Sequence, residues 1–231
     1  MNDDHVLSAT AGYVDTLSFV ALFGLFTAHV TGNFVLIGGG IAGYGQGVFL
    51  KLMAFPAFIC GVALSSFLVR ASHPKTPMHG AFRLYAVQAI LLLAFCAAGM
   101  HLGPTFSPAN ASVVVCGMIG AMAMGVQNAH SRLIERPGVP NTVMTGNVTQ
   151  VILDVLDLFS PRVADDVKHI ARVRVAKMLP AIIAFGLGAI GGALAYKYFG
   201  FVALALPAIA VAWLAVRAWL HRDGDLLQEA K

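Results

Sequence analysis

Residues 47–70 have the sequence GVFLKLMAFPAFICGVALSSFLVR, in which Lys51 and Arg70 are the only charged side chains. A helix needs about 20 mostly apolar residues to cross the hydrocarbon core of a bilayer, so this stretch predicts a spanning helix. Similar apolar runs cover residues 80–102, 111–133, 173–197 and 199–220, with charges almost confined to their ends. The sequence therefore predicts an all-α, polytopic membrane protein.

The composition of the whole chain supports this class. Of its 231 residues, 58% are hydrophobic and 11% are charged, whereas a soluble domain has about 25% charged residues. This balance excludes an ordinary soluble domain, a disordered chain and a disulfide scaffold. The net charge of +4 comes from basic residues that flank apolar runs instead of forming a stripe with aromatics. No nucleic-acid partner is therefore predicted.

Several small residues inside the apolar runs favour packing over chemistry. Three cysteines occur there without a CxxC pair, which argues against redox or metal chemistry: Cys60, Cys96 and Cys116. Two pairs of small residues spaced by four predict close helix packing: Gly61 with Ser65, and Gly188 with Gly192. No metal and no cofactor is predicted.

The region 6–44 is harder to divide, because it is too long for one span and short for two spans with a turn. It contains Asp15, His29 and the glycine run 38–40. We predict a spanning helix over about 6–27, followed by a re-entrant segment near 31–43 that dips into the membrane without crossing it. A corresponding re-entrant segment is predicted near 141–157.

The distribution of Lys and Arg supports six spans. With six crossings, 13 of these residues fall on one side of the membrane and only Lys51 and Lys197 on the other, in agreement with the positive-inside rule. If both re-entrant segments crossed, the split would be much weaker. Both termini and residues 73–79 and 162–172 are predicted to be cytoplasmic, and residues 104–109 external. The charged stretch 157–177 is predicted to be an interfacial helix or a solvated loop.

The chain also repeats itself weakly. Thr31-Gly32-Asn33 recurs as Thr145-Gly146-Asn147, residues 12–15 (GYVD) match 125–128 (GVQN), and residues 56–59 (PAFI) match 180–183 (PAII). The matches occur in the same order, which divides the chain into repeats of about 6–103 and 111–221. Each repeat holds three spans, an odd number, so the second must be inverted relative to the first. Inverted repeats are typical of transporters, whose site lies near the midplane between the halves.

These motifs resemble those of a known family. Gly12, Asp15 and Phe19 precede the first Thr-Gly-Asn, and a Gly-x-Gln-Asn-Ala motif at 125–129 precedes the second. This pattern resembles the YoaK-like family of bacterial inner-membrane proteins, over about residues 8–220. The resemblance implies a six-span protein of the bacterial inner membrane. It implies no activity, because the family has no assigned substrate or reaction.

The two Thr-Gly-Asn segments supply six candidate substrate-contacting residues: Thr31, Gly32, Asn33, Thr145, Gly146 and Asn147. Thr can cap free backbone N–H groups, Gly tolerates close approach, and Asn both donates and accepts hydrogen bonds. Two inverted half-helices would direct their positive dipole ends toward the membrane centre and favour an anion or a polar solute. The alternative is that these residues only satisfy the irregular backbone of the re-entrant turns.

Four further polar residues complete the candidate site: Asp15, His29, Gln127 and Asn128. Asp15 is the only acid well inside a predicted span, near the midplane, where a carboxylate is costly. Its counterpart in the second repeat is the neutral Asn128. Asp15 is either part of a proton or cation relay, joined by His29, or a protonated packing residue bonded to Thr16, Gln127 or Asn128.

The sequence contains no HExxH, GxSxG or phosphate-loop motif, so we predict no enzyme activity. The predicted function is a transporter or channel for a small polar or anionic solute, with proton coupling through Asp15 as one version. A membrane scaffold or sensor that transports nothing, or an intramembrane enzyme, is the alternative. The predicted partners are the lipid bilayer and a small solute, with a homo-oligomer left open.

Overall fold

The computed structural model describes residues 3–70, 77–103, 106–134, 142 and 144–221. Within these ranges the elements are helical: α1 (Asp3–Ala21), α2 (Gly32–Ile41), α3 (Val48–Arg70), α4 (Pro77–Met100), α5 (Ala111–Leu133), α6 (Met144–Phe159), α7 (Asp165–Phe199), the 3-10 helix η1 (Gly200–Leu204) and α8 (Ala205–His221). These ranges contain no strand, which confirms the all-α class.

Four helical segments in the described part of the chain are long and apolar enough to cross a membrane: Val48–Arg70, Gly80–Met100, Ala111–Leu133 and Asp165–His221. The last of these spans 57 residues and contains α7, η1 and α8. It turns at Gly200, whose φ of 58° lies in the left-handed region that favours glycine. The chain therefore runs back along the bundle after α7.

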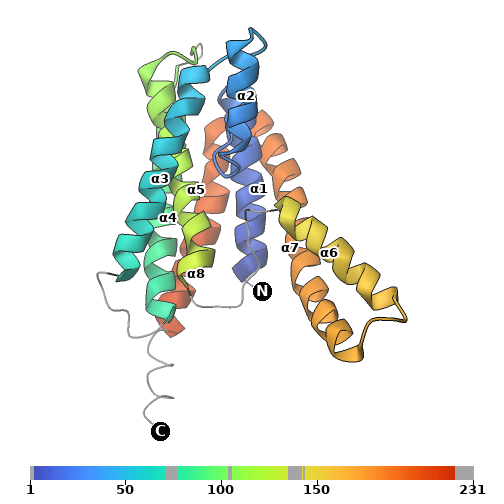
Figure 1. Ribbon diagram of the computed structural model, residues 1–231. Coiled ribbons are helices and arrows are strands. Elements are labelled where there is room, and N and C mark those ends of the chain that lie inside the picture. The colour runs from blue at the N-terminus through green and yellow to red at the C-terminus, as the bar shows by residue number, and fades with distance from the viewer. Residues whose placement is uncertain (1–2, 71–76, 104–105, 135–141, 143, 222–231) are drawn as a thin grey trace.

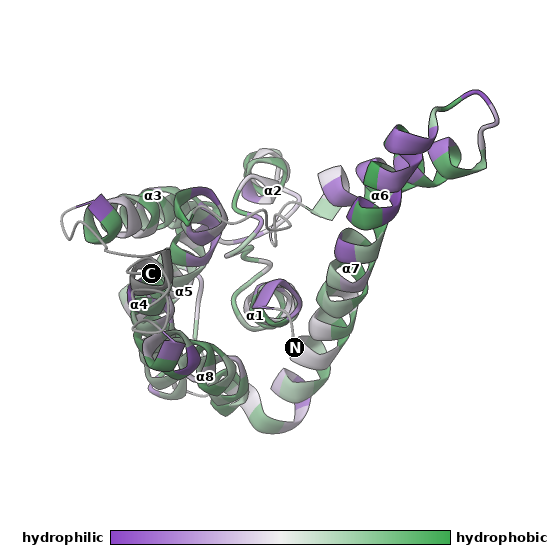
Figure 2. Cartoon of the chain, turned by 90° about the horizontal axis from the view of Figure 1, so that it is seen from below, coloured by the Kyte–Doolittle hydropathy of each residue, from purple (hydrophilic) through white to green (hydrophobic). Residues whose placement is uncertain are grey.

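Neighbouring helices come from distant parts of the sequence. α1, α4 and α7 run in one direction, and α3, α5 and α8 run in the other (Figure 1). α1 packs along α7, α3 packs along α5, and α4 packs along both α5 and α8. Figure 2 shows the result from below, with α3, α4, α5 and α8 grouped on one side and α1 with α7 on the other.

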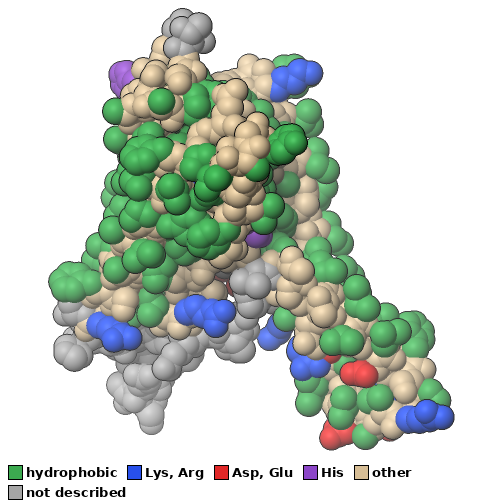
Figure 3. All heavy atoms as spheres, turned by 45° about the horizontal axis from the view of Figure 1, so that its top comes forward, with side chains coloured by type: hydrophobic (Ala, Val, Ile, Leu, Met, Phe, Trp, Pro, Cys, Tyr) green, Lys and Arg blue, Asp and Glu red, His purple; other side chains and the backbone are tan. Residues whose placement is uncertain are grey.

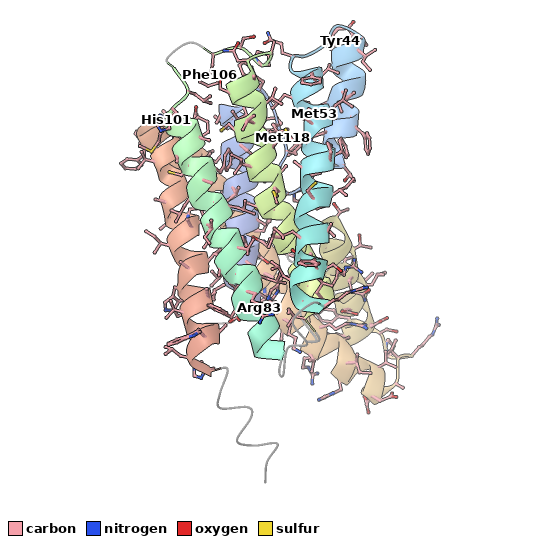
Figure 4. All side chains as sticks on the ribbon, turned by 90° about the vertical axis from the view of Figure 1, so that its left-hand side faces the viewer. Tyr44, Met53, Arg83, His101, Phe106 and Met118 are labelled. Atoms are coloured by element: carbon pink, nitrogen blue, oxygen red, sulfur yellow. The ribbon has the colours of Figure 1, made fainter. Side chains whose placement is uncertain are left out.

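The outer surface has the polarity of a protein in lipid. Large apolar side chains are exposed along the outer helix faces, among them Phe67, Ile90 and Leu187. Figure 3 shows hydrophobic side chains over the middle of one face, with Lys and Arg near its margins. Arg83 lies near one end of α4 and His101 directly follows the other end (Figure 4). Apolar flanks with polar ends match the layering of a bilayer.

The α1–α7 pair is held by glycine contacts. A Cβ added at Gly12 of α1 would collide with the carbonyl oxygen of Phe185 in α7. A Cβ added at Gly188 of α7 would collide in turn with the carbonyl oxygen of Ala9 in α1. The two backbones therefore approach as closely as the absence of side chains permits.

The α3–α5 pair is built in the same way. A Cβ at Gly125 of α5 would collide with the carbonyl oxygen of Phe58, and one at Gly61 of α3 would collide with that of Met122. Close packing through the small-residue pairs is thus confirmed at Gly61 and Gly188. It also holds at the second member of one pair, since Gly192 lies against the backbone of Tyr13.

α6 and the first part of α7 form a helical hairpin that extends away from the bundle (Figures 1 and 2). Asp154 of α6 is fully buried and accepts hydrogen bonds from Nε and Nη2 of Arg174 in α7, at 3.0 and 2.5 Å. Gln150 Nε2 donates a third bond to Asp154, at 2.9 Å. The Arg174 guanidinium lowers the pKa of Asp154, against the opposing effect of burial. This charged pair stabilises the packing of α6 against α7.

Two predicted boundaries are wrong. α1 ends at Ala21, so the predicted span 6–27 is too long, and Phe23 and Gly24 then have φ of 54° and 77°. Two successive residues with left-handed backbone cannot continue a right-handed helix. The predicted span 173–197 starts too late, because α7 is continuous from Asp165, so that residues 165–177 of the predicted interfacial stretch are helical. Of the predicted loops, residues 73–76 and 104–105 lie outside the described part of the chain.

Candidate functional site

One cavity borders both Thr-Gly-Asn segments. It has a volume of about 410 Å³ and lies where the starts of α2 and α6 meet α3 and α5. Its lining residues are Ala28, His29, Val30, Thr31, Phe55, Phe58, Ile59, Asn128, Thr142, Met144 and Thr145. The polar groups therefore come from both predicted repeats, and α3 contributes an apolar wall.

Asp15 of α1 fixes the turn that precedes α2. Its side chain is 5% exposed. Its Oδ1 accepts hydrogen bonds from the backbone N–H groups of Thr27 and Ala28, both at 2.7 Å, and its Oδ2 lies 2.7 Å from Nδ1 of His29. The partners expected for a packing role, Thr16, Gln127 or Asn128, are therefore wrong. Because α1 ends early, the chain turns back and brings residues 27–29 to this carboxylate.

His29 connects the buried carboxylate to the cavity. Its side chain is 34% exposed and lines the cavity, and its ring packs edge-on against Phe185 of α7, with centroids 5.4 Å apart. When Asp15 accepts the Nδ1–H of His29, Nε2 is the ring nitrogen that remains available to a ligand. The structure thus brings together Asp15 and His29, the two residues of the relay hypothesis.

Asn33 holds the turn before α2 without lining the cavity. Its Oδ1 accepts the backbone N–H of Phe26 at 3.0 Å, and its Nδ2 donates to the carbonyl of Phe26 at 2.8 Å. Ser18 and Thr27, both fully buried, place their hydroxyl oxygens 3.0 Å apart in the same turn. These bonds satisfy irregular backbone, which is the structural role considered for the Thr-Gly-Asn segments.

Thr31 borders the cavity and does not cap α2. Its φ and ψ of −65° and −24° are helical, and its side chain makes no capping hydrogen bond, so the predicted capping role is wrong at this position. Gly32 packs against the ring of Phe26. Thr145 is the second residue of α6 and also lines the cavity, while Gly146 is exposed.

In the second predicted repeat, Asn128 of α5 holds the segment that precedes α6. Its Nδ2 donates to Oγ1 of Thr142 at 2.6 Å, and both residues line the cavity. This contact has the same place in the chain as that of Asp15 with residues 27–29. Asn147 is 3% exposed, with its Nδ2 4.0 Å from Sδ of Met144, and does not line the cavity.

Gln127 lies in the helix packing and away from the cavity. Its Nε2 donates to the carbonyl of Leu7 at 2.8 Å, and its Oε1 accepts from Nε2 of Gln88 at 2.6 Å. Both glutamine side chains are buried. They tie α5 to α1 and α4, as buried polar groups in a bundle must find partners.

Sequence reasoning missed Thr142 and the apolar wall formed by Phe55, Phe58 and Ile59. Thr142 lies in a stretch without periodic hydropathy, so no helix pattern drew attention to it. A signal was nevertheless present, because Thr142 follows His29 at the same separation in the sequence as Gly125 follows Gly12. The three wall residues belong to an apolar run, in which no pattern distinguishes a cavity lining from a lipid-facing surface.

Apolar helices around a cavity with polar groups at two short helices define a polytopic helical membrane protein. The chain belongs to the family described as a protein of unknown function, DUF1275, which matches residues 5–217. It is 28% identical over 222 residues to the UPF0700 transmembrane protein YoaK of Bacillus subtilis (strain 168), covering 95% of this chain and 94% of that protein. No solved structure matches the chain. The predicted family is therefore confirmed.

Proposed function

We propose that the protein is a transporter or channel for a small polar or anionic solute, with its site in the cavity between Thr31 and Thr145. The observation that carries this proposal is the convergence of both Thr-Gly-Asn segments on one cavity. Transporters with inverted repeats bind their solutes near the bilayer midplane, where interrupted helices from the two halves meet. Proton coupling acts through the buried Asp15 and its contact with His29.

The glycine contacts support two inverted repeats. Gly12 of α1 faces the carbonyl of Phe185 in α7, and Gly125 of α5 faces the carbonyl of Phe58 in α3. Gly12 corresponds to Gly125 in the sequence repeat, so equivalent helices in the two halves meet their partners at equivalent depths. This correspondence aligns Phe58 with Phe185, whereas the sequence match of residues 56–59 with 180–183 aligns Phe58 with Ile182. The two alignments therefore differ by a small shift along α7.

The contacts made by the glycines of α3 and α7 follow the same alignment of the two halves. Gly61 faces the carbonyl of Met122, and Gly188 faces that of Ala9. Ala9 and Met122 are as far apart in the sequence as Gly12 and Gly125, and the Gly61-to-Gly188 separation equals that of the two phenylalanines named above. If α1 is exchanged with α5, and α7 with α3, the contacts of the α1–α7 pair become those of the α3–α5 pair. Because each exchanged helix runs opposite to its counterpart (Figure 1), this relation favours an inverted repeat over a parallel one.

The proposed topology has six crossings, by α1, α3, α4, α5, α7 and α8, with α2 and α6 as re-entrant or interfacial helices. The end of the bundle where α1 begins and α8 ends carries Arg70, Arg83 and Arg217. By the positive-inside rule this end faces the cytoplasm of a bacterial inner membrane. The opposite end carries Tyr44 and Phe106 (Figure 4).

The test is solute flux into liposomes that contain the purified protein, with L-lactate, lactamide, malate and glycerol as probes. We expect protein-dependent flux of at least one probe, lowered at least tenfold by Thr31→Val or Thr145→Val. The matched control is Thr149→Val, one turn along α6 from Thr145 and outside the cavity lining. Absence of protein-dependent flux for all four probes, or equal losses in all three variants, would contradict the proposal.

A further inference from the structure

We infer that the solute is a small monocarboxylate with an apolar body, and that one proton accompanies each solute molecule on Nε2 of His29. This inference rests on the proposed transport function and names the substrate class and the coupling group of the same cavity. It is argued from the charge, the shape and the hydrogen bonds of the described residues that line the cavity.

The charge of the lining selects a single negative charge. Among the described residues that border the cavity, His29 is the one side chain that can become positive, and no Lys, Arg, Asp or Glu lines it. The first turns of α2 and α6 add partial positive charge, because Thr31 and Thr145 border the cavity at the starts of these helices. A protonated His29 would share its positive charge between Asp15 and the bound carboxylate, so the cavity can hold one carboxylate with the help of the two helix starts, whereas a dianion would add a second negative charge without a partner.

The apolar wall selects a solute with a hydrocarbon part. Phe55, Phe58 and Ile59 of α3 line the cavity together with Val30 and Met144. The volume of about 410 Å³ lies near the lower end of the roughly 300–1,000 Å³ typical of small-molecule sites. A small carboxylate can thus place its charged end toward His29 and its apolar part against α3.

The polar residues that line the same cavity can orient a carboxylate or a neighbouring hydroxyl. Thr31 and Thr145 border the cavity from the two halves of the chain, and Asn128 and Thr142, which are hydrogen-bonded to each other, border it as well. A substituent oxygen next to the carboxylate would find donors and acceptors here. This arrangement favours a hydroxy acid over a plain fatty acid.

Asp15 positions the exchanging proton and does not carry it. Both of its oxygens are engaged, Oδ1 by the N–H groups of Thr27 and Ala28 and Oδ2 by Nδ1 of His29. Nε2 of His29 takes a proton from water at one side of the membrane, and the resulting imidazolium binds the carboxylate. Release of the carboxylate at the other side returns that proton to water. The proton and the carboxylate that cross together carry no net charge, which avoids placing an isolated ion at membrane depth.

The groups that surround His29 leave Asp15 as its titratable neighbour among the described contacts. From α7 the ring of Phe185 packs against it. From the other elements at the cavity the neighbouring side chains include Phe58 of α3, Asn128 of α5 and Thr145 of α6, none of which titrates near neutral pH. Asp15 is therefore the ionisable side chain that the described contacts place beside His29.

The decisive experiment is calorimetric titration of L-lactate into the purified full chain in detergent, between about pH 5 and 8, the range in which imidazole titrates. Two buffers of different ionisation enthalpy give the number of protons taken up. We expect uptake approaching one proton per lactate, and an affinity that falls roughly tenfold per pH unit once His29 is neutral, as linkage requires. Lactamide, the uncharged isostere, should bind at least tenfold more weakly at low pH, and the dianion malate should also bind more weakly.

His29→Gln should weaken lactate binding at least tenfold and remove its pH dependence. The matched control, His101→Gln, lies beyond the end of α4 and outside the cavity, and it should match the wild type. Equal binding of lactate and lactamide, or no proton uptake by the wild type, would overturn the inference. The wild-type measurement needs no variant, so it decides even if His29→Gln fails to fold. In the liposome assay, flux of lactamide but not of lactate would overturn the inference of a monocarboxylate and leave the transport proposal in place. Absence of protein-dependent flux for every probe would overturn the transport proposal itself.

Discussion

Oδ2 of Asp15 lies 2.7 Å from Nδ1 of His29, although the two residues belong to different elements and are separated by a turn. The contact orients the imidazole through Nδ1, and His29 itself borders the cavity. A carboxylate that orients a histidine in this way also selects its tautomer. The pair therefore links the packing of α1 to the chemistry of the cavity.

Replacement of Asp15 by Asn tests this link. The Asn Oδ1 can still accept the N–H groups of Thr27 and Ala28, so the turn should persist. Its Nδ2 would present a donor to Nδ1 of His29, which favours the neutral ring with the proton on Nε2. We expect an intact fold, proton-coupled flux lowered at least tenfold, and a flat pH dependence in liposomes at matched protein levels. Profiles identical to those of the wild type would mean that Asp15 only supports the turn.

The glycine contacts give a second prediction, on stability. Gly12→Ala and Gly125→Ala each force a methyl group against a backbone carbonyl, so each should lower the free energy of unfolding by about 1–3 kcal/mol. Gly186→Ala is the control, because nothing lies within 4 Å of a Cβ at that position, and it should be neutral or stabilise by up to about 1 kcal/mol. Thermal unfolding in detergent measures all three. A large effect at only one of Gly12 and Gly125 would contradict the equivalence of the two helix pairs.

Lys51 yields a third prediction. It is 3% exposed, and its Nζ donates to the carbonyls of Phe23 at 2.7 Å and Gln46 at 2.6 Å. Lys51→Met should keep most of the packing but leave these carbonyls without their donor, at a cost of about 1–3 kcal/mol for each that water cannot reach. Thermal unfolding should show a lower midpoint for this variant than for Lys197→Met, whose side chain is exposed. Equal midpoints would show that water replaces the ammonium.

The hairpin of α6 and α7 should respond to acid. Arg174 lowers the pKa of Asp154 in the folded protein, so the stability from their pairing is present above about pH 4, the ordinary range of Asp. That stability is lost as the pH falls through the lowered pKa. Hydrogen exchange of residues 144–178 should therefore accelerate in acid. Asp154→Asn should show fast exchange already at neutral pH, and a hairpin equally protected in that variant would contradict the role of the pair.

The proposed orientation can be tested by labelling. In a background without Cys60, Cys96 and Cys116, a membrane-impermeant thiol reagent added outside the cell should reach cysteines placed at Tyr44 or Ser107. It should not reach one at His169 until the membrane is opened. Tyr44 is 86% exposed and His169 is also exposed, so accessibility within the protein does not limit either reaction. The reverse pattern would invert the proposed topology.

Hydropathy predicted the long helices well, because the residues that face lipid or a neighbouring helix are alike in polarity. The predicted run 111–133 coincides with α5, and 47–70 differs from α3 only at its first position. The end of α1 could not be predicted in this way, since residues 22–26 are as apolar as the helix itself. α1 ends because the backbone is left-handed at Phe23 and Gly24. At Phe23 the residue type gives no sign of this conformation.

Part of the candidate site could also be predicted from the sequence. Repetition of Thr-Gly-Asn identified Thr31 and Thr145, and the scarcity of acids within the spans identified Asp15. The backbone partners of Asp15 were not predictable, because they depend on a turn that follows the helix. Gln127 carries the same polarity as the cavity residues, yet its bonds lead to Leu7 and Gln88. Polarity alone does not distinguish a ligand contact from a satisfied packing residue.

The backbone-to-backbone contacts at Gly12 and Gly125 also restrict how the molecule can deform. Because carbonyls fill the space where side chains would be, α1 and α7 cannot slide past one another, and neither can α3 and α5. Each pair combines one helix from the first half of the sequence with one from the second, so the closely packed helix pairs do not coincide with the predicted repeats. Any opening of the cavity to alternate sides would have to occur as a rocking of the α1–α7 body against the α3–α5 body, with His29 and Thr145 at the seam.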